Sequence, residues 1–320
     1  MLSRSNSSQV TKSWTCSITL SISLSLDSGC RTTGLESWTN SHRIIQSDVG
    51  GRWNISNLGA ILFAKRLDQF DRLTRKAVRV IQYKGRSKAE TVREQPGGRG
   101  YAAGFEGLIT FIDGLLPRNE LIGKALRETR PVYPEIAIRE LVANALIHQD
   151  MTVSGAGPMI EIYTDRIEIT NPGVPLIDVR KFIGAAPRSR NEALSDLMRR
   201  MNICEERGSG IVKVITSVEL YQLPAPDFRV ADDSTRVVLF SPRKFRDMNA
   251  AERIRACYQH AALRYHSGDM MTNASLRERL GVEKRNAAQV SRIITDALAS
   301  GQIKSADPDA PRSGYIPFWA

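Results

Sequence analysis

The stretch ELVANALIHQD, residues 140–150, carries the strongest indication of fold and function in this chain. Its polar residues Glu140, Asn144 and His148 recur at every fourth position, so on a helix they lie along one face, one turn apart. The apolar residues between them would face a core. The stretch therefore predicts a buried helix that presents a carboxylate and an amide to a site. A water-activating carboxylate beside an amide ligand of Mg²⁺ suits nucleotide chemistry.

Two glycine-containing motifs follow this helix in a telling order. The alternating segment 158–170 predicts a β-hairpin with one buried face, and it ends in the turn signal NPG, residues 171–173. The segment RGSG, residues 207–210, then precedes another apolar helix. Glycines at a helix start let backbone N–H groups approach a phosphate, and the helix dipole favours the anion. The ordered set favours a phosphate-bearing ligand.

Each of these features also has a simpler interpretation. A glutamate such as Glu140 can be solvated on a helix surface, and a histidine such as His148 can merely pack at a helix end. Both glycine motifs are also typical of ordinary tight turns. Their combination and order distinguish the nucleotide hypothesis from these alternatives.

The ordered motifs resemble the GHKL-type ATP-binding fold of gyrase, heat-shock, histidine-kinase and mismatch-repair ATPases. More closely, the chain resembles ATP-binding transcriptional regulators of the RecG C-terminal-like family, which commonly carry an N-terminal, Schlafen-like AlbA-type DNA-binding domain. The resemblance covers residues 44–320 and depends on segments 139–150, 167–173, 189–191 and 206–211. The AlbA-type domain is largely absent, and residues 1–43 stand where most of it would be.

The resemblance implies ATP and Mg²⁺ as cofactors and a role for each matching residue. Glu140 would be the water-activating base, and Asn144 the Mg²⁺ ligand. The residues that would bind the cofactors are Asn144, His148, Asn171, Gly173, Arg207, Gly208 and Gly210, with Asn171 and Gly173 at the adenine end and Gly208 and Gly210 at the phosphates. One departure is that characterised ATPases have Asp-x-Gly-x-Gly where this chain has Asn-Pro-Gly. Asparagine can either accept or donate a hydrogen bond, whereas aspartate accepts.

The C-terminal residues 249–320 show a different pattern, with three predicted helices followed by a ribbon. This order is typical of a winged helix-turn-helix. A formal net charge of +11 favours a polyanionic partner, most simply DNA. The candidate phosphate-contacting cations are Lys284, Arg285, Arg292, Lys304 and Arg312. The alternatives are a solvated helix face and a winged helix that contacts protein.

The remaining patterns complete the predicted organisation. Between residues 43 and 128 they predict a short hairpin at 43–56, a strand at 78–83, a polar loop at 85–100 and a helix through 103–128. The Ser/Thr-rich segment 1–43 fits either a disordered tail or a shifted reading frame. The sequence thus predicts an α+β fold, with a GHKL-like α/β sandwich at 44–245 followed by a winged helix-turn-helix at 249–320.

The cysteines and the apolar runs restrict the kinds of site and the location that we expect. The four cysteines form no Cys-x-x-Cys pair, so neither a zinc site nor a disulfide framework is expected. No apolar run is long enough to span a bilayer, and we expect a cytoplasmic protein without a membrane partner. The sequence does not decide whether the protein forms a homo-oligomer.

The leading prediction for function is an ATP-binding, DNA-binding transcriptional regulator. The alternatives are a DNA-acting ATPase, for example in repair or defence, and a degenerate remnant that no longer binds nucleotide. The sequence has no Gly-x-x-x-x-Gly-Lys-Ser/Thr loop, so it lacks the phosphate-binding loop of a helicase motor.

Overall fold

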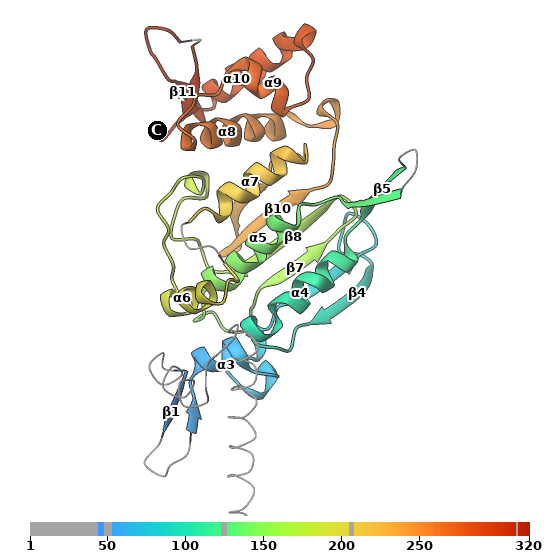
Figure 1. Cartoon of the computed structure of the whole chain (residues 1–320), viewed down its shortest axis with the longest axis vertical. Coiled ribbons are helices and arrows are strands. Elements are labelled where there is room, and N and C mark those ends of the chain that lie inside the picture. Colours follow the sequence, from blue (N-terminus) through green and yellow to red (C-terminus); the bar gives the residue numbers. More distant parts are fainter. Residues whose placement is uncertain (1–43, 48–52, 123–126, 205–207, 312) are drawn as a thin grey trace, which may run out of the picture.

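The computed structural model describes residues 44–47, 53–122, 127–204, 208–311 and 313–320 (Figure 1). The Ser/Thr-rich segment 1–43, Arg207 and Arg312 lie outside these described residues. The expectations placed on them therefore stay predictions.

The N-terminal part of the described chain contains a short hairpin and a helix. Strands β1 (Ile45–Ser47) and β2 (Trp53–Ile55) pair antiparallel, which confirms the hairpin expected at 43–56. Helix α3 (Asn57–Phe63) begins after Ser56, whose hydroxyl accepts a hydrogen bond from the Gly59 amide at 3.0 Å. This hydrogen bond caps the helix, because it satisfies a backbone N–H group that has no partner within the first turn. Two short 3₁₀ turns, η1 (Leu67–Gln69) and η2 (Thr74–Lys76), lead to the main sheet.

The main sheet has six strands in the order β4 (Thr91–Pro96), β3 (Arg79–Tyr83), β7 (Met159–Ile162), β8 (Arg166–Pro172), β10 (Ser234–Phe240) and β9 (Asp227–Ala231). Neighbouring strands run antiparallel except β3 and β7, which are parallel. The β7–β8 pair confirms the hairpin expected at 158–170. Ile160 and Ile169 of this hairpin are each 2% exposed and belong to the main hydrophobic core.

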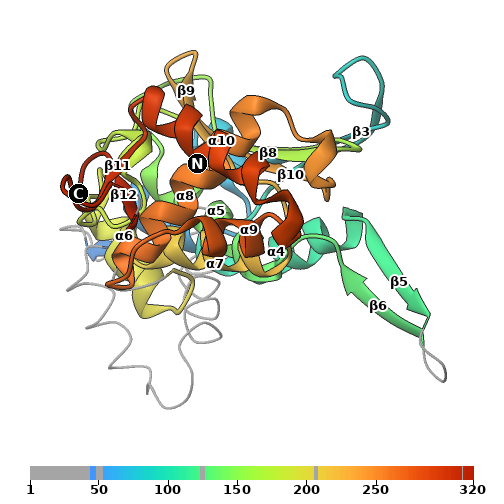
Figure 2. The same cartoon turned by 90° about the horizontal axis from the view of Figure 1, so that it is seen from above.

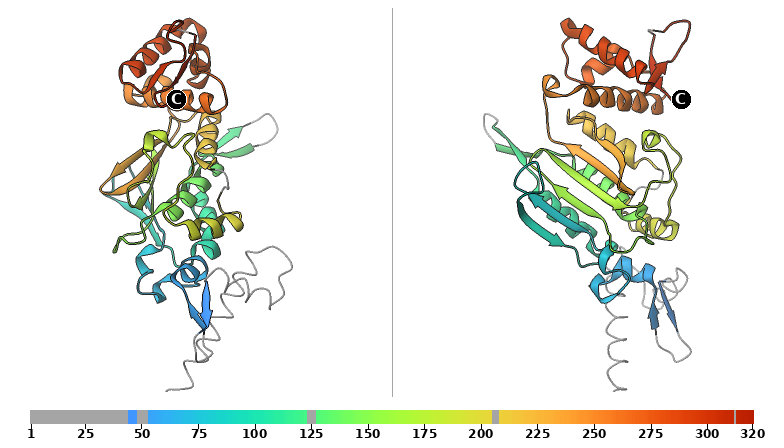
Figure 3. Two further views of the ribbon diagram at one scale, coloured as in Figure 1. Left: turned by 90° about the vertical axis from the view of Figure 1, so that its left-hand side faces the viewer. Right: turned by 180° about the vertical axis from the view of Figure 1, so that it is seen from behind.

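Helices α4 (Tyr101–Leu115), α5 (Glu135–His148) and α7 (Gly210–Leu220) cover one face of the sheet (Figures 1 and 3). Helix α5 carries the polar face predicted from the sequence. It packs on β8, and both α4 and α7 pack against it. Because it has neighbours on several sides, nearly every turn of α5 is buried, including Glu140.

Two expectations for the first third of the chain were wrong. The helix expected through 103–128 ends at Leu115, because Pro117 disfavours helical backbone at the preceding residue, and Leu116 is extended. Strands β5 (Arg118–Ile122) and β6 (Arg127–Pro131) follow instead and form a hairpin that projects from the body (Figure 2). The loop expected at 85–100 contains β4, an edge strand with every residue exposed. Pairing with β3 holds β4, so its sequence shows no alternating apolar pattern.

A segment without a long helix joins the sheet to α7. Residues 174–190 form a loop that contains the single 3₁₀ turn η3 (Val179–Lys181). Helix α6 (Glu192–Arg200) then packs Leu194, Leu197 and Met198 into the main core. We refer to residues 174–190 as the covering segment, since they form part of the cavity described below.

The C-terminal residues form three helices and a two-stranded ribbon around a second hydrophobic core. These elements are α8 (Ala250–His266), α9 (Asn273–Arg279), α10 (Ala287–Ala299), β11 (Ile303–Ser305) and β12 (Tyr315–Pro317), with short turns η4 (Phe245–Asp247) and η5 (Lys284–Asn286). A capping box between Asn249 and Glu252 starts α8. Gly301 follows α10 in the left-handed conformation, which is typical of a helix end.

The C-terminal region lies against α7 through α8 (Figure 1). The contact includes polar side chains: Glu219 at the end of α7 lies 3.0 Å from His260 Nδ1 and pairs with Arg279 Nε at 3.2 Å. The whole is an α+β fold, as predicted. None of the helices in the described ranges is long and apolar enough to cross a bilayer.

Candidate functional site

A cavity of about 510 Å³ lies beside α5, between the C-terminal end of β8, the start of α7, helix α6 and the covering segment. This volume falls within the usual range of small-ligand sites, about 300–1,000 Å³. The candidate site residues that line it are Glu140, Asn144, His148, Asn171, Gly208 and Gly210. Residues that are 70 positions apart in the chain, such as Glu140 and Gly210, therefore contribute to one site.

Glu140 and Asn144 lie where α5 meets the first residue of α7. Glu140 is 6% exposed, and a Cβ placed on Gly210 would lie 2.6 Å from Glu140 Oε2 and 3.8 Å from Asn144 Nδ2. Such a Cβ would overlap the carboxylate, so position 210 requires glycine for close packing. The carboxylate, the amide and the N-terminal end of α7 are consequently adjacent.

Asn171 and Gly173 lie at the end of β8, where Gly173 is next to Asp150, just after α5. Asn171 lines the cavity, and its Nδ2 donates to the Pro172 carbonyl oxygen at 3.4 Å. This orientation leaves Asn171 Oδ1 as the acceptor of the side-chain amide. Gly173 lies outside the lining, with a φ of +100°. A Cβ there would lie 2.5 Å from Arg190 Nη1, so only glycine fits both the conformation and the space.

Backbone and side-chain bonds hold this end of the site together. The Asp150 amide donates to the Pro172 carbonyl oxygen at 2.8 Å, which joins the residue after α5 to the end of β8. Thr235 Oγ1, from β10, donates to the Gly173 carbonyl oxygen at 2.8 Å and also lines the cavity. The turn after β8 is therefore fixed from both neighbouring elements.

His148, at the last turn of α5, lines the cavity and is partly buried. Burial lowers the pKa of its imidazole, and the nearby Arg190 guanidinium lowers it further. His148 is therefore neutral near pH 7. It can pack or exchange hydrogen bonds with a ligand, but it brings no positive charge to a phosphate.

The motif SRN, residues 189–191, joins the end of the covering segment to its start and to the end of α5. Asn191 Nδ2 donates to the carbonyl oxygens of Ile147 at 2.7 Å and Gln149 at 2.8 Å, which lack helical partners at the end of α5. Arg190 Nη2 donates to the Val174 carbonyl oxygen at 2.9 Å, and Arg190 Nη1 lies 3.7 Å from Asp150 Oδ2. The motif was recognised in the sequence, but only the structure gives these contacts.

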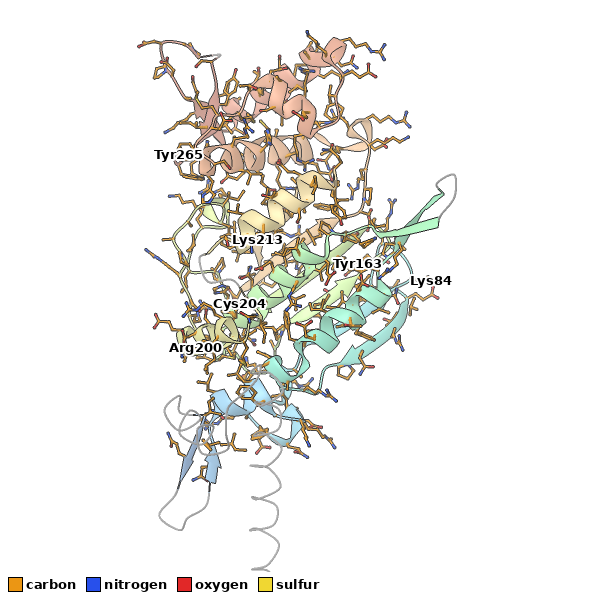
Figure 4. The ribbon with its side chains drawn as sticks, viewed as in Figure 1. Lys84, Tyr163, Arg200, Cys204, Lys213 and Tyr265 are labelled. Carbon is orange, nitrogen blue, oxygen red and sulfur yellow. The ribbon has the colours of Figure 1, made fainter. Side chains whose placement is uncertain are left out.

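Sequence reasoning missed several other lining residues. Phe182 and Phe228 form one apolar wall, with ring centroids 5.6 Å apart in an edge-to-face arrangement. Arg188, which is exposed, contributes a cation from the covering segment. Cys204, just after α6, also lines the cavity, and Figure 4 shows its place relative to Lys213 on α7. These residues stand in loops and on an edge strand, where the sequence has no spacing that would have indicated them.

The residues present can accommodate Mg²⁺ only together with a ligand. In the described part of the chain, no group of three or more His, Cys, Asp or Glu side chains could hold a metal ion. Asn144 and Glu140 offer oxygen ligands, which Mg²⁺ prefers, but they are too few for its octahedral shell. Phosphate oxygens and water would have to supply the rest, as in many nucleotide sites.

The described members of the candidate DNA-contacting set are not among the residues that line this cavity and belong to the C-terminal region. Lys284 and Arg285 are exposed in η5, and Arg292 is exposed on α10. Arg285 Nε pairs with Glu283 Oε2 at 2.5 Å, and Lys304 Nζ, on β11, donates to the Ala320 carbonyl oxygen at 2.5 Å. Among the described residues, Lys284 and Arg292 are thus exposed cations without an ion pair or side-chain hydrogen bond of this kind.

Comparison with known proteins supports an ATPase-related domain. A family model described as "Putative ATP-dependent DNA helicase recG C-terminal" matches residues 155–239, which contain Asn171, Gly173, Gly208 and Gly210. Helix α5, with Glu140, Asn144 and His148, precedes the matched range but lines the same cavity. A search of curated proteins found no match.

The crystal structure of the DIP2311 protein from Corynebacterium diphtheriae is similar in fold, with a TM-score of 0.56 and 17% sequence identity. The similarity covers 88% of this chain and 57% of that protein. This chain therefore matches a little more than half of that longer protein. At this identity the likeness concerns the fold alone.

Proposed function

We propose that the chain binds ATP together with Mg²⁺ in the cavity beside α5. The observation that carries this proposal is the meeting of Glu140, Asn144, Asn171, Gly208 and Gly210 around one cavity of about 510 Å³. The family match to a RecG C-terminal-like ATPase domain at residues 155–239 supports it. Each of these residues also has the chemistry that its predicted role needs.

The adenine end of the ligand lies at β8, and the phosphates lie at α7. Asn171 Oδ1 accepts a hydrogen bond from the adenine amino group, since Asn171 Nδ2 is directed to the Pro172 carbonyl. The ring packs against the apolar wall formed by Phe182 and Phe228. The phosphates approach the backbone N–H groups at Gly208 and Gly210, where the dipole of α7 favours an anion.

Glu140 and Asn144 act at the terminal phosphate. Asn144 Oδ1 completes the shell of a Mg²⁺ ion that is otherwise bound by phosphates and water. Glu140 orients and deprotonates the attacking water if ATP is hydrolysed. Its closeness to Gly210 puts this base beside the same helix end that receives the phosphates.

The C-terminal residues 249–320 form a winged helix-turn-helix that binds DNA, and residues 44–245 form a GHKL-like domain that modulates it. The three helices with a ribbon and the exposed Lys284 and Arg292 support this part of the proposal. The net charge of +11 also favours a polyanionic partner. The protein as a whole is accordingly an ATP-binding transcriptional regulator.

Isothermal titration of the full chain with ATP, with and without Mg²⁺, tests the proposal. We expect one saturable site whose affinity rises when Mg²⁺ is present. The absence of binding under both conditions would support the degenerate-remnant alternative and overturn the proposal. Measurable phosphate release that DNA stimulates would favour the DNA-acting ATPase.

A further inference from the structure

The covering segment has two sides, and its second side contacts the C-terminal region. Phe182 lines the cavity, whereas the next residue, Ile183, is 3% exposed and packs with Ile215 of α7 and Ala262 of α8. Leu263 and Trp319 join the same apolar cluster. Consecutive residues of this segment therefore contact the ligand cavity and the C-terminal region.

Trp319 packs against this cluster and lies beside Gly184. A Cβ on Gly184 would lie 3.4 Å from both Trp319 Cη2 and His266 Nδ1, which is an ordinary contact distance. The indole is therefore a neighbour of the covering segment at Gly184, where the φ of +84° favours glycine. The neighbouring Phe318 contacts the same segment, with the Arg180 guanidinium 5.1 Å from its ring centroid.

The indole is also fixed to α8. Trp319 Nε1 donates to Tyr258 Oη at 3.1 Å, and the Trp319 ring meets the Tyr265 ring edge-to-face with centroids 5.6 Å apart. Figure 4 marks Tyr265 on α8, on the same side as the C-terminal end. Trp319 is therefore held by the C-terminal region on one side and contacts the covering segment on the other.

Helix α7 has contacts at both of its ends. Its first turn lines the cavity through Gly210 and Ile211, and its last turn is paired through Glu219 with His260 and Arg279. Ionic contacts at one end and close packing at the other restrain its movement. The covering segment has no comparable helix or strand, so a change at the cavity is accommodated by this segment more readily than by α7.

We propose that Trp319 is a positioning residue for the nucleotide cavity, acting by holding the covering segment against it. This inference rests on the proposed ATP site. It adds the contact through which ATP binding is coupled to the C-terminal region. Because coupling between two sites is reciprocal, ATP binding also changes the surroundings of Trp319. Removal of the indole frees the segment, and ATP binding must then order it again.

The test combines isothermal titration with tryptophan fluorescence on the full chain. Trp319→Ala should weaken ATP binding by about fivefold or more, the lower end of typical coupling energies. Trp319→Phe keeps a ring against Gly184 and should restore most of the affinity. Trp53→Phe, in β2 at the opposite end of the molecule, is the matched control and should bind ATP as the wild type does.

Fluorescence supplies a readout that a purely structural role would not give. ATP should change the emission of the wild type and of Trp53→Phe, and this change should disappear in Trp319→Phe. Thermal melting checks that the variants fold. If Trp319→Ala does not fold, the emission test on Trp319→Phe still decides the inference.

The outcomes separate the two proposals. An ATP titration in which Trp319→Ala binds as tightly as the wild type would overturn this inference alone. So would an emission change that persists in Trp319→Phe. A wild type that binds no ATP would overturn the proposed function and this inference with it.

Discussion

The Glu140 carboxylate and Gly210, the first residue of α7, are in such close contact that a methyl group on Gly210 would lie 2.6 Å from Glu140 Oε2. Gly210→Ala should therefore displace the carboxylate or the helix start and weaken ATP binding by about tenfold, equivalent to ~1.4 kcal/mol. Isothermal titration measures this. Gly107→Ala on α4 is the control, because no atom lies within 4 Å of its added Cβ. Equal affinities in the two variants would contradict the placement of phosphates at α7.

Replacement of the proposed base separates binding from turnover. Glu140→Gln keeps the size of the side chain but removes its basicity. ATP affinity should stay near that of the wild type, while any Mg²⁺-dependent phosphate release should fall by about 10²–10⁴-fold, the usual contribution of a general base. Single-turnover phosphate release measures this. Unchanged turnover would exclude Glu140 as the base.

Lys76 should stabilise the turn after α5. It is 3% exposed, and its Nζ donates to the carbonyl oxygens of Asp150 at 3.2 Å, Val153 at 2.6 Å and Ala156 at 3.3 Å. Lys76→Met keeps the stem but leaves these acceptors without the ammonium, so we expect a loss of about 1–3 kcal/mol in the free energy of unfolding.

Urea denaturation checks this, with Lys65→Met as the control. Lys65 is exposed, and its substitution should change stability by no more than about 0.5 kcal/mol. Equal midpoints for the two variants would show that the three carbonyl contacts of Lys76 contribute little.

His148 should make stability depend on pH on the acidic side of neutrality. Its folded pKa is lowered by burial and by Arg190, so the unfolded chain binds its proton more readily. The stabilisation is complete above the unfolded pKa of about 6.5 and is lost as pH falls from there through the folded pKa. His148→Gln should flatten this part of a plot of stability against pH. An unchanged slope would contradict the buried neutral imidazole.

Arg292 tests the proposed DNA contact. Arg292→Ala should weaken binding to all duplex sequences alike and reduce the slope of log affinity against log salt by about 1, as expected for one lost phosphate contact. Fluorescence anisotropy at several salt concentrations measures the slope. Lys65→Ala, an exposed cation in the N-terminal part of the described chain, is the control. A slope equal to that of the control would remove α10 from the DNA contact.

The helix at the centre of the site could be predicted because its pattern is local. Glu140, Asn144 and His148 recur at helical spacing, and the apolar residues among them fill the core. The hairpin at 158–170 was likewise predicted from a short pattern. In each case the residues that determine the element lie within it.

The features that could not be predicted depend on distant partners. Strand β4 has only exposed residues and exists because it pairs with β3. The β5–β6 hairpin follows Pro117, which ended the apolar helix earlier than its periodicity suggested. Phe182 and Phe228 come from a loop and an edge strand to form one wall of the cavity, and Trp319 lies beside Gly184 although it is far along the chain. Because the residues of such pairs are far apart in the chain, no local spacing pattern in the sequence indicates that they meet.

The parallel pairing of β3 with β7 has a consequence for the order in which the protein folds. It joins Arg79 to Met159, 80 positions apart, and α4 and α5 both lie in the intervening chain. Closing this long connection costs conformational entropy before the pairing of the central strands stabilises the fold. This cost slows folding. The face of α5 and the end of β8 come together only after this closure. The nucleotide cavity should accordingly form late, so a refolding chain should acquire most of its helix before it can bind ATP.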